Sequence, residues 1–219
     1  MASFTVENYL KAIYQLSQKT EGGVTTNAIA DHIGTKAATV SDMLKKLNTQ
    51  KLINYKKYQG TELTTKGRSM AIEIIRKHRL WEVFLVEKLD FKWDEVHDIA
   101  EELEHIESEE LTNRLEVFLD NPKFDPHGDP IPDREGNIQR RAQVPLSEVA
   151  TGLTGIVTGV KDSSKAFLQY LDTMGIYLGN EIQVTEIFEY DKSRTIETDG
   201  RMLTLSLQAS KNLFVKTEA

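Results

Sequence analysis

Hydrophobic residues near the N-terminus recur every three or four positions, which is the spacing of one face of an α-helix. The residues that make this pattern are Val6, Leu10, Ile13 and Leu16. They predict a first helix over about 5–19. A short second helix is expected over 28–33, because polar residues suited to capping precede it and Gly34 follows it. The candidate caps are Thr25, Thr26 and Asn27.

The next hydrophobic pattern predicts a third helix over about 38–48, with Val40, Leu44 and Leu47 on one face. Short extended segments at about 52–55 and 62–64 follow, joined through a turn at Gln59-Gly60. Two helices joined by a tight turn and followed by a hairpin are typical of a winged helix-turn-helix domain. In such a domain the second helix of the pair enters the major groove of DNA.

The middle of the chain predicts more helices. Thr65 is expected to cap a long helix over about 66–88, and two shorter helices fit 94–107 and 109–119. All five prolines then lie between positions 122 and 145, in a stretch that cannot continue a helix. The change of pattern across this stretch indicates separate domains. The predicted domains are 1–65, 66–142 and 143–219.

The C-terminal segment alternates hydrophobic and polar residues, as strands with one buried face do. One expected strand presents Leu203, Leu205, Leu207 and Ala209 on a single face, and another begins with Ile182 and Val184. Glycines separate the short strands, and one small helix fits about 164–173. The pattern favours a small, partly open β-barrel. The predicted fold class is therefore mainly α with a small β part.

Composition and charge narrow the function. The chain has no cysteine, which excludes disulfides, thiolate zinc sites, iron–sulfur clusters and cysteine nucleophiles. No apolar run approaches the roughly 18 residues of a membrane span, so a soluble cytoplasmic protein without a membrane partner is expected. The net charge of −7 hides an asymmetry: residues 1–75 carry ten basic and six acidic residues, whereas 76–145 carry ten and eighteen. The basic first part could bind phosphates, and the acidic second part could bind cations.

The third expected helix begins with short side chains that fit the major groove. Thr39, Ser41 and Asp42 are candidates to contact base edges, and Ala38 lies beside them. The candidate phosphate contacts are Lys36, Lys45, Lys46, Lys56 and Lys57. A helical unit that binds only protein is the alternative. The local basic charge favours DNA.

Histidines and glutamates in the middle of the chain have the spacing of metal ligands. Four of them fall at i, i+4, i+7 and i+8 and would share one helical stripe: His97, Glu101, Glu104 and His105. His78 and Glu82 form a second pair one turn apart, and such imidazole and carboxylate sets suit divalent ions. The alternative is a solvated acidic face, since six of the ten residues in 101–110 are glutamates. We expect His32 at the surface, and we expect His127 to make a hydrogen bond in a turn.

Longer motifs run through nearly the whole chain. They are Glu7-Asn-Tyr-Leu-Lys-Ala-Ile-Tyr, Ala38-Thr-Val-Ser, Leu63-Thr-Thr-Lys-Gly-Arg, Arg76-Lys-His-Arg-Leu-Trp-Glu, His97-Asp-Ile-Ala-Glu-Glu-Leu-Glu-His and Asp125-Pro-His-Gly-Asp-Pro-Ile-Pro. Together they resemble the family of metal-dependent repressors that includes the diphtheria toxin repressor and the manganese transport regulator. The C-terminal segment resembles the SH3-like domain of that family, which is similar to a small ferrous-transport accessory protein.

The resemblance assigns roles to particular positions. It implies metal ligation by His78, Glu101, Glu104 and His105, with Glu101 where the iron branch of the family has Cys. It also implies an ancillary set in which His78 joins Glu82 and His97, and the ancillary ligands of the barrel fall near Ser163 and Ala166. Asn8 stands where the manganese branch has a ligand Asp and the iron branch has Met. Lys11 stands where the manganese branch has a Glu that binds a second metal.

The function implied by the resemblance is metal-dependent repression of transcription. A homodimer built from about residues 66–120 is expected, because this region has more apolar residues than one short helical pair can bury. Its two recognition helices would meet a palindromic DNA operator about one turn apart, roughly 34 Å. Mn²⁺ is the expected ion, with Fe²⁺ as the alternative and Zn²⁺ or Co²⁺ as ions that the same ligands accept in vitro. A metal-dependent hydrolase is a competing interpretation, but no His-Glu-x-x-His pattern and no nucleophile motif supports it. A winged-helix regulator that binds DNA without any metal is another competing interpretation.

Overall fold

The computed structural model describes residues 3–20, 22–56 and 60–217, and the chain folds into two compact units. The first unit comprises Met1–His78, Glu101–Thr112 and Pro132–Ile138, and the second comprises Arg79–Ala100, Asn113–Ile131 and Gln139–Ala219. Within the described residues, no helix combines the length and the apolar character that a membrane crossing requires.

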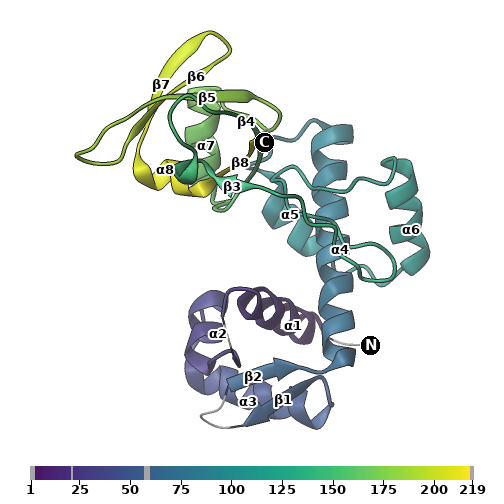
Figure 1. Ribbon diagram of the computed structural model, residues 1–219. Helices are drawn as coiled ribbons and strands as arrows, with labels where there is room; N and C mark the ends of the chain where they lie inside the picture. The colour runs from purple at the N-terminus through teal and green to yellow at the C-terminus, as the bar shows by residue number, and fades with distance from the viewer. Residues whose placement is uncertain (1–2, 21, 57–59, 218–219) are drawn as a thin grey trace. The chain divides into compact units, whose positions relative to one another are not determined.

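The first unit contains a winged helix-turn-helix (Figure 1). Its elements are α1 (Phe4–Ser17), α2 (Thr26–Ile33), α3 (Ala37–Thr49), β1 (Ile53–Lys56), β2 (Gly60–Leu63) and the start of α4 (Thr65–Leu89). Strands β1 and β2 are antiparallel, with Ile53 opposite Leu63. This is the predicted order of elements, and each observed boundary lies within two residues of its prediction. The predicted turn at Gln59-Gly60 falls partly on residues 57–59, outside the described residues.

Caps explain where the helices begin and end. The Thr25 hydroxyl accepts a hydrogen bond from the Ala28 amide, and Gly34 ends α2 in the left-handed conformation at φ 71°. Of the three candidate caps, Thr25 is therefore the one that bonds. The prediction that Thr65 caps the long helix is wrong by one residue. The Thr64 hydroxyl accepts from the Gly67 amide, whereas Thr65 is already the first residue of α4.

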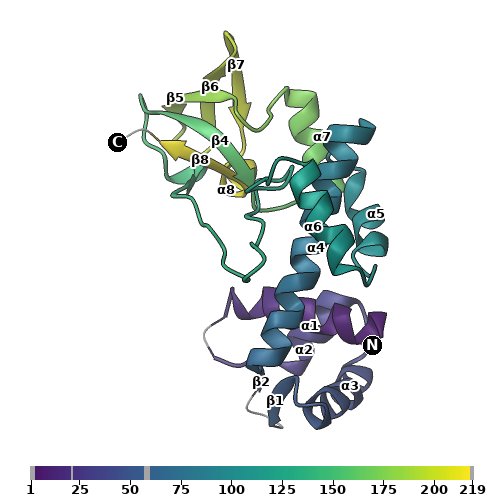
Figure 2. The ribbon, with the colours of Figure 1, turned by 90° about the vertical axis from the view of Figure 1, so that its right-hand side faces the viewer.

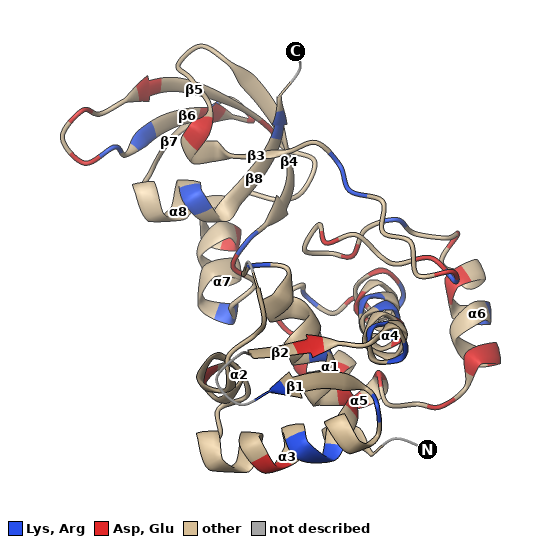
Figure 3. Cartoon of the chain, turned by 60° about the horizontal axis from the view of Figure 1, so that its bottom comes forward, with Lys and Arg blue, Asp and Glu red and all other residues tan. Residues whose placement is uncertain are grey.

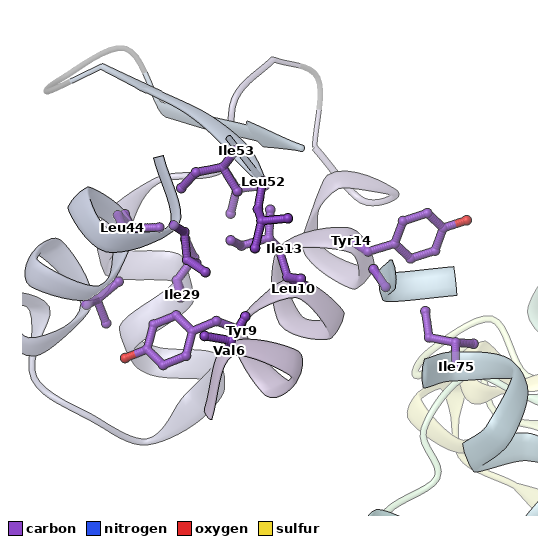
Figure 4. Packing of buried hydrophobic residues seen from close by; sticks show 14 of the residues in the cluster. Val6, Tyr9, Leu10, Ile13, Tyr14, Ile29, Leu44, Leu52, Ile53 and Ile75 are labelled. Atoms are coloured by element: carbon purple, nitrogen blue, oxygen red, sulfur yellow. The ribbon is translucent and has the colours of Figure 1, made fainter. Parts of the chain in front are cut away.

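A single hydrophobic core joins α1, α2, α3 and the hairpin. Figure 4 shows Leu10 and Ile13 of α1 packed with Ile29 of α2 and Leu44 of α3, and all four side chains are completely buried. Ile53 of β1 closes the same cluster. Deleting a side chain from such a core costs about 2–5 kcal/mol of folding free energy. Helix α1 is therefore held firmly against α2, α3 and the hairpin.

The two helices after α4 are α5 (Val96–Leu103) and α6 (Glu109–Phe118). Helix α5 is shorter than the predicted 94–107, because the Ile106 amide bonds to the Leu103 carbonyl and closes a turn. Ser108 then caps α6 by accepting from the Leu111 amide. Glu104 and His105 consequently lie in a turn beyond the end of α5, and the stripe predicted for a single helix is interrupted there.

The second unit has two hydrophobic clusters. Leu80 and Val83 of α4 pack with Leu115 of α6, and Leu119 and Ile131 complete this smaller cluster. The larger cluster fills the C-terminal domain. Thus part of the apolar surface that the sequence suggested for dimerisation is buried within the chain itself. Val117 and Phe118 of α6 remain mostly exposed.

The C-terminal domain is a six-stranded antiparallel sheet in the order β3-β8-β4-β5-β6-β7, and β4 and β8 lie side by side (Figure 2). Its elements are β3 (Val144–Pro145), η1 (Leu146–Glu148), β4 (Thr154–Val160), α7 (Lys165–Met174), β5 (Glu181–Ile187), β6 (Arg194–Thr198), β7 (Arg201–Leu205), α8 (Leu207–Asn212) and β8 (Leu213–Thr217). Leu207 and Ala209 were predicted on a strand, and this is wrong. Ser206 caps α8 by accepting from the Ala209 amide, so the chain turns helical there.

Candidate metal centres and nucleic-acid interface

Two side chains of α1 enter a polar cluster, which we call the first centre. It consists of Glu7, Lys11, His78, Glu101, Glu104 and His105. Glu7 and Lys11 are four residues apart, so they project from the same face of α1, and each is only 7% exposed. His78 comes from α4, Glu101 from the last turn of α5, and Glu104 and His105 from the turn that follows.

The groups of the first centre are in direct contact in two sets, one on Glu7 and the other on Lys11. Nδ1 of His105 lies 2.6 Å from Oε2 of Glu7. Oε2 of Glu104 lies 2.6 Å from Nδ1 of His78 and 2.5 Å from Nζ of Lys11. The Lys11 ammonium is also 3.7 Å from Oε1 of Glu101. These contacts connect α1 both with α4 and with the turn after α5.

Proton positions in the first centre follow from the donors and acceptors. Burial raises the pKa of Glu104, but the hydrogen bond from His78 and the charge of Lys11 outweigh it and hold this pKa below its ordinary value. Glu104 is therefore an ionised acceptor. The proton between it and His78 must be on Nδ1 of His78, which leaves Nε2 as the basic nitrogen of that ring.

Of the predicted ligands, the structure places His78 in contact with Glu104 and has Glu101 at the exposed edge, whereas His105 contacts Glu7. The side chain from α1 beside His105 is Glu7, whereas Asn8 is exposed on another face of the helix. Sequence reasoning missed Glu7 because the resemblance directed attention to position 8. The sequence did contain a signal for this residue. Glu7 lies one helical turn before Lys11, so both charged side chains were expected on one face of the first helix.

A second acidic cluster lies within the second unit. Glu82, Asp125 and His127 are all buried, and their possible ligand atoms lie within 4.8 Å of one another. We call them the second centre. Nδ1 of the half-exposed His97 lies 3.6 Å from Oε1 of Glu82, so this part of the predicted ancillary set adjoins the same carboxylate. His78, predicted for either set, is in contact with Glu104 in the first unit.

His127 was expected only to make a turn hydrogen bond. Its amide does donate to Oδ1 of Asp125, at 2.9 Å. Its ring does more, since Nε2 lies 2.8 Å from the Trp93 carbonyl oxygen and must donate to it. Nδ1 then faces Oε1 of Glu82 at 3.7 Å. Because Nε2 is held by a backbone carbonyl, Nδ1 is the nitrogen that would bind a metal ion beside Glu82.

Electrostatics in the second centre reflect an excess of buried negative charge. Burial raises the pKa of Asp125, and the neighbouring charge of Glu82 raises it further. Burial alone would lower the pKa of His127, but hydrogen bonding to Glu82 and the charges of Glu82 and Asp125 raise it to about 9. The imidazole is thus a cation at neutral pH, and an ion bound at Nδ1 would displace its proton. Arg79 adds a second positive charge beside Asp125, with Nε 3.4 Å from Oδ2.

Close packing fixes the loop that carries His127. Gly128 has φ 87°, and a β-carbon there would overlap the carbonyl oxygen of Thr158 in β4. The carbonyl of His127 accepts from the Val160 amide. Trp93 joins the same region to α7 by donating from Nε1 to Asp172 at 2.9 Å. Ser163 and Ala166, where the resemblance expected ancillary ligands, are exposed near the start of α7.

The donor sets of both centres suit a hard or borderline divalent cation. Each contains carboxylate oxygens and imidazole nitrogens in a largely buried position, and each already contains positive charge supplied by the protein. Buried carboxylates of this kind require a compensating cation. The ligand atoms of Glu82, Asp125 and His127 lie within 4.8 Å of one another and would hold an ion in the second centre. In the first centre, Glu7, Glu101, Glu104 and His105 would have to come closer together to hold one ion. Such ligands accept both manganese and ferrous ions.

Helix α3 presents the predicted DNA contacts at the surface. Ala38 and Thr39 are exposed, and the Ser41 hydroxyl donates to the Ala37 carbonyl while keeping its acceptor capacity. Asp42 pairs with Lys45 at 2.9 Å, and Figure 3 shows both signs of charge on this helix. Lys36, Lys46 and Lys56 are also exposed. Lys57 lies outside the described residues.

Three domain models match the chain in order. The iron dependent repressor N-terminal DNA binding domain matches residues 1–61. The iron dependent repressor metal binding and dimerisation domain matches 64–133, and the FeoA domain matches 144–217. The first two segments include α3 and every residue of both centres.

Similar proteins carry related names. The iron-dependent repressor IdeR of Mycobacterium leprae is 41% identical over 129 residues, which are 58% of this chain and 55% of that protein, so the chain spans about half of this relative. The diphtheria toxin repressor of Corynebacterium efficiens is 30% identical over 91% of this chain and 89% of that protein. A solved manganese-dependent transcriptional repressor in complex with manganese is 34% identical, with a TM-score of 0.86 over 97% of this chain and 100% of that one.

Proposed function

Because the chain belongs to the family of metal-dependent repressors that includes the diphtheria toxin repressor, we propose that it is a manganese-responsive repressor of metal-uptake genes. Members of this family are transcriptional regulators and not enzymes. One observation carries the proposal: in the first centre, side chains of α1 contact His78 and the turn after α5. A ligand bound there acts on the helix that packs against α3.

The chain's own residues provide the connection between metal and DNA. Glu7 and Lys11 face the first centre, while Leu10 and Ile13 on the same helix are buried in the core that positions α3. An ion bound by Glu7 together with Glu104 and His105 would supply the positive charge that ties α1 to the turn after α5. A preference of a few kcal/mol for the arrangement that fits DNA is sufficient to change operator occupancy.

The proposal includes the assembly and the domain division. We assign DNA binding to 1–65, dimerisation and metal binding to 66–142, and the SH3-like domain to 143–219. The homodimer would place two α3 helices on a palindromic operator. We assign the protein to the cytoplasm, because bacterial DNA lies there. The exposed Val117 and Phe118 on α6 support a protein contact by the helical domain. We further assign Glu82, His97, Asp125 and His127 to a second ion.

The choice of manganese depends on the ligands of the first centre. They are carboxylates and imidazoles without a sulfur donor, and oxygen-rich sets suit Mn²⁺. We therefore expect Mn²⁺ to activate operator binding at least as strongly as Fe²⁺, and Glu101→Cys to shift the preference away from Mn²⁺. Fluorescence anisotropy with a selected palindromic duplex, under anaerobic conditions, measures both. Strong activation by Fe²⁺ with none by millimolar Mn²⁺ would favour the iron-responsive alternative. Equal affinity with a chelator present would contradict metal dependence altogether.

Substitutions in and near α3 test the DNA interface. Thr39→Ala and Ser41→Ala should weaken specific binding by about 5- to 100-fold and leave non-specific binding nearly unchanged, because these side chains face base edges. Lys46→Ala should weaken both and reduce the salt slope by about 1, because it removes a phosphate contact. Titrations with operator and random duplexes at several salt concentrations separate these effects. Equal losses on both duplexes for all three variants would contradict the assignment of α3.

A further inference from the structure

A groove lies within the first unit, between four parts of the winged helix-turn-helix. It is formed by the start of α1, the end of α3, the residue before β1 and the start of α4. Its volume is about 480 Å³, which is within the usual range of ligand-binding sites. The lining residues are Ser3, Val6, Lys46, Gln50, Leu52, Lys66 and Met70. The groove is therefore separate from both candidate metal centres.

The floor of the groove is apolar and held in place by packing. Val6 and Leu52 belong to the hydrophobic core of the first unit and are buried. Gly67 in the first turn of α4 approaches Leu52 so closely that a β-carbon would overlap its carbonyl oxygen. The amide and the hydroxyl of Thr64 both donate to that same oxygen. The start of α4 is thus fixed against the floor before any ligand binds.

The rim of the groove is cationic. Lys46 comes from α3 and Lys66 from α4, and both side chains are exposed. Neither ammonium has an ion-pair partner in the part of the chain that the structure describes, whereas Lys45 is paired with Asp42. The Ser3 hydroxyl does not cap α1, so it remains able to donate to a ligand. The described lining includes no Asp or Glu that would repel an anion.

An apolar floor below a cationic rim fits a ligand with an anionic group beside an apolar surface. The phosphodiester and deoxyribose of a DNA strand have this combination. The position of the groove favours DNA, because Lys46 lies on α3 about one turn beyond Asp42, a candidate base contact. Backbone contacts beside a recognition helix fix its register on the duplex. The groove continues the α3 surface as far as α4.

We propose that this groove binds one phosphodiester group of the operator backbone between Lys46 and Lys66, with the adjoining sugar on Val6 and Leu52. The proposal rests on the proposed function, because it assumes that α3 enters the major groove. It adds the start of α4 to the DNA-contacting surface. Because a phosphate carries no base identity, the groove contributes affinity and register but does not select the sequence.

Lys66→Met tests the proposal, because it removes the ammonium and keeps most of the side chain. We expect it to weaken binding of the full-length protein to operator and random duplexes alike, by about 3- to 10-fold per chain at about 0.15 M salt, and to reduce the salt slope by about 1 per chain. Fluorescence anisotropy with saturating Mn²⁺ measures both effects. Lys66→Arg, which keeps the charge, should retain the wild-type slope. Lys211→Met, at an exposed lysine of α8, is the matched control and should also retain it.

Ethylation interference shows whether the two lysines share one phosphate. In each half-site, one ethylated phosphate should impair binding by the wild type and have no further effect on Lys66→Met or on Lys46→Ala. An unchanged salt slope in Lys66→Met, or two lysines that map to different phosphates, overturns the proposal. Titration with decanoate examines the other occupant: micromolar binding, lost in Lys66→Met while its DNA slope stays unchanged, would assign the groove to amphipathic small molecules instead. Failure of the proposed function is a different result, namely wild-type operator binding that ignores metal.

Discussion

Glu104→Gln is expected to lower metal-activated affinity for operator DNA by at least about 100-fold, equivalent to about 2.7 kcal/mol. Glu104 is the residue that contacts both α1, through Lys11, and α4, through His78. An amide of the same shape cannot neutralise a divalent ion or the Lys11 ammonium. The variant should therefore lose the metal response and leave a buried ammonium poorly compensated. Anisotropy titrations with saturating Mn²⁺ and with a chelator measure the loss.

Glu102→Gln is the matched control for this prediction. Glu102 is an exposed residue of α5 two positions away, and its replacement changes the net charge by the same amount. It should keep the metal response. Thermal unfolding of the metal-free Glu104→Gln protein shows whether the variant is folded at the assay temperature. A folded Glu104→Gln protein with wild-type metal-activated binding would contradict the role of the first centre.

The winged helix-turn-helix was predictable because its core follows simple periodicities. Leu10 and Ile13 on α1 and Leu44 on α3 are spaced for one buried face, and all three are completely buried. Boundaries were less predictable where short-range hydrogen bonds decide them. Thr64 rather than Thr65 caps α4, and Ser206 starts a helix in what alternation alone suggested was a strand. A capping hydroxyl competes with the periodic pattern, and the pattern does not show which prevails.

The two candidate metal centres were predictable only in part, because the ligand spacing was evaluated along a single helix. His78 and Glu104 were found by spacing and resemblance, but their contact depends on the turn that ends α5. Glu7 was missed because its partner, His105, lies 98 positions away in the sequence. His127 was assigned a turn hydrogen bond, which exists, while its ring contacts Glu82 from a helix more than forty residues earlier. Long-range contacts of this kind leave no periodic signal.

Glu82 is the acidic group around which the second centre is organised. It is 2% exposed, and its Oε1 faces the Nδ1 atoms of both His97 and His127. Its charge also contributes to the raised pKa values of Asp125 and His127. Removing this charge alone, without changing the shape of the side chain, isolates its part in metal binding.

Glu82→Gln is therefore expected to weaken binding at the second centre by about 100-fold, or about 2.7 kcal/mol, and to reduce the bound Mn²⁺ from two ions per chain to one. Dialysis of the full-length protein against Mn²⁺ counts the ions. In a Trp81→Phe background, the fluorescence comes from Trp93 alone, whose ring centroid lies 6.3 Å from that of His127, and it reports on the second centre locally. Glu87→Gln, an exposed change on the same helix, should bind two ions as wild type does. Because the first centre shares no residue with the second, its operator response should persist in Glu82→Gln. Two ions bound by Glu82→Gln with unchanged affinity would show that the second centre is not a metal site.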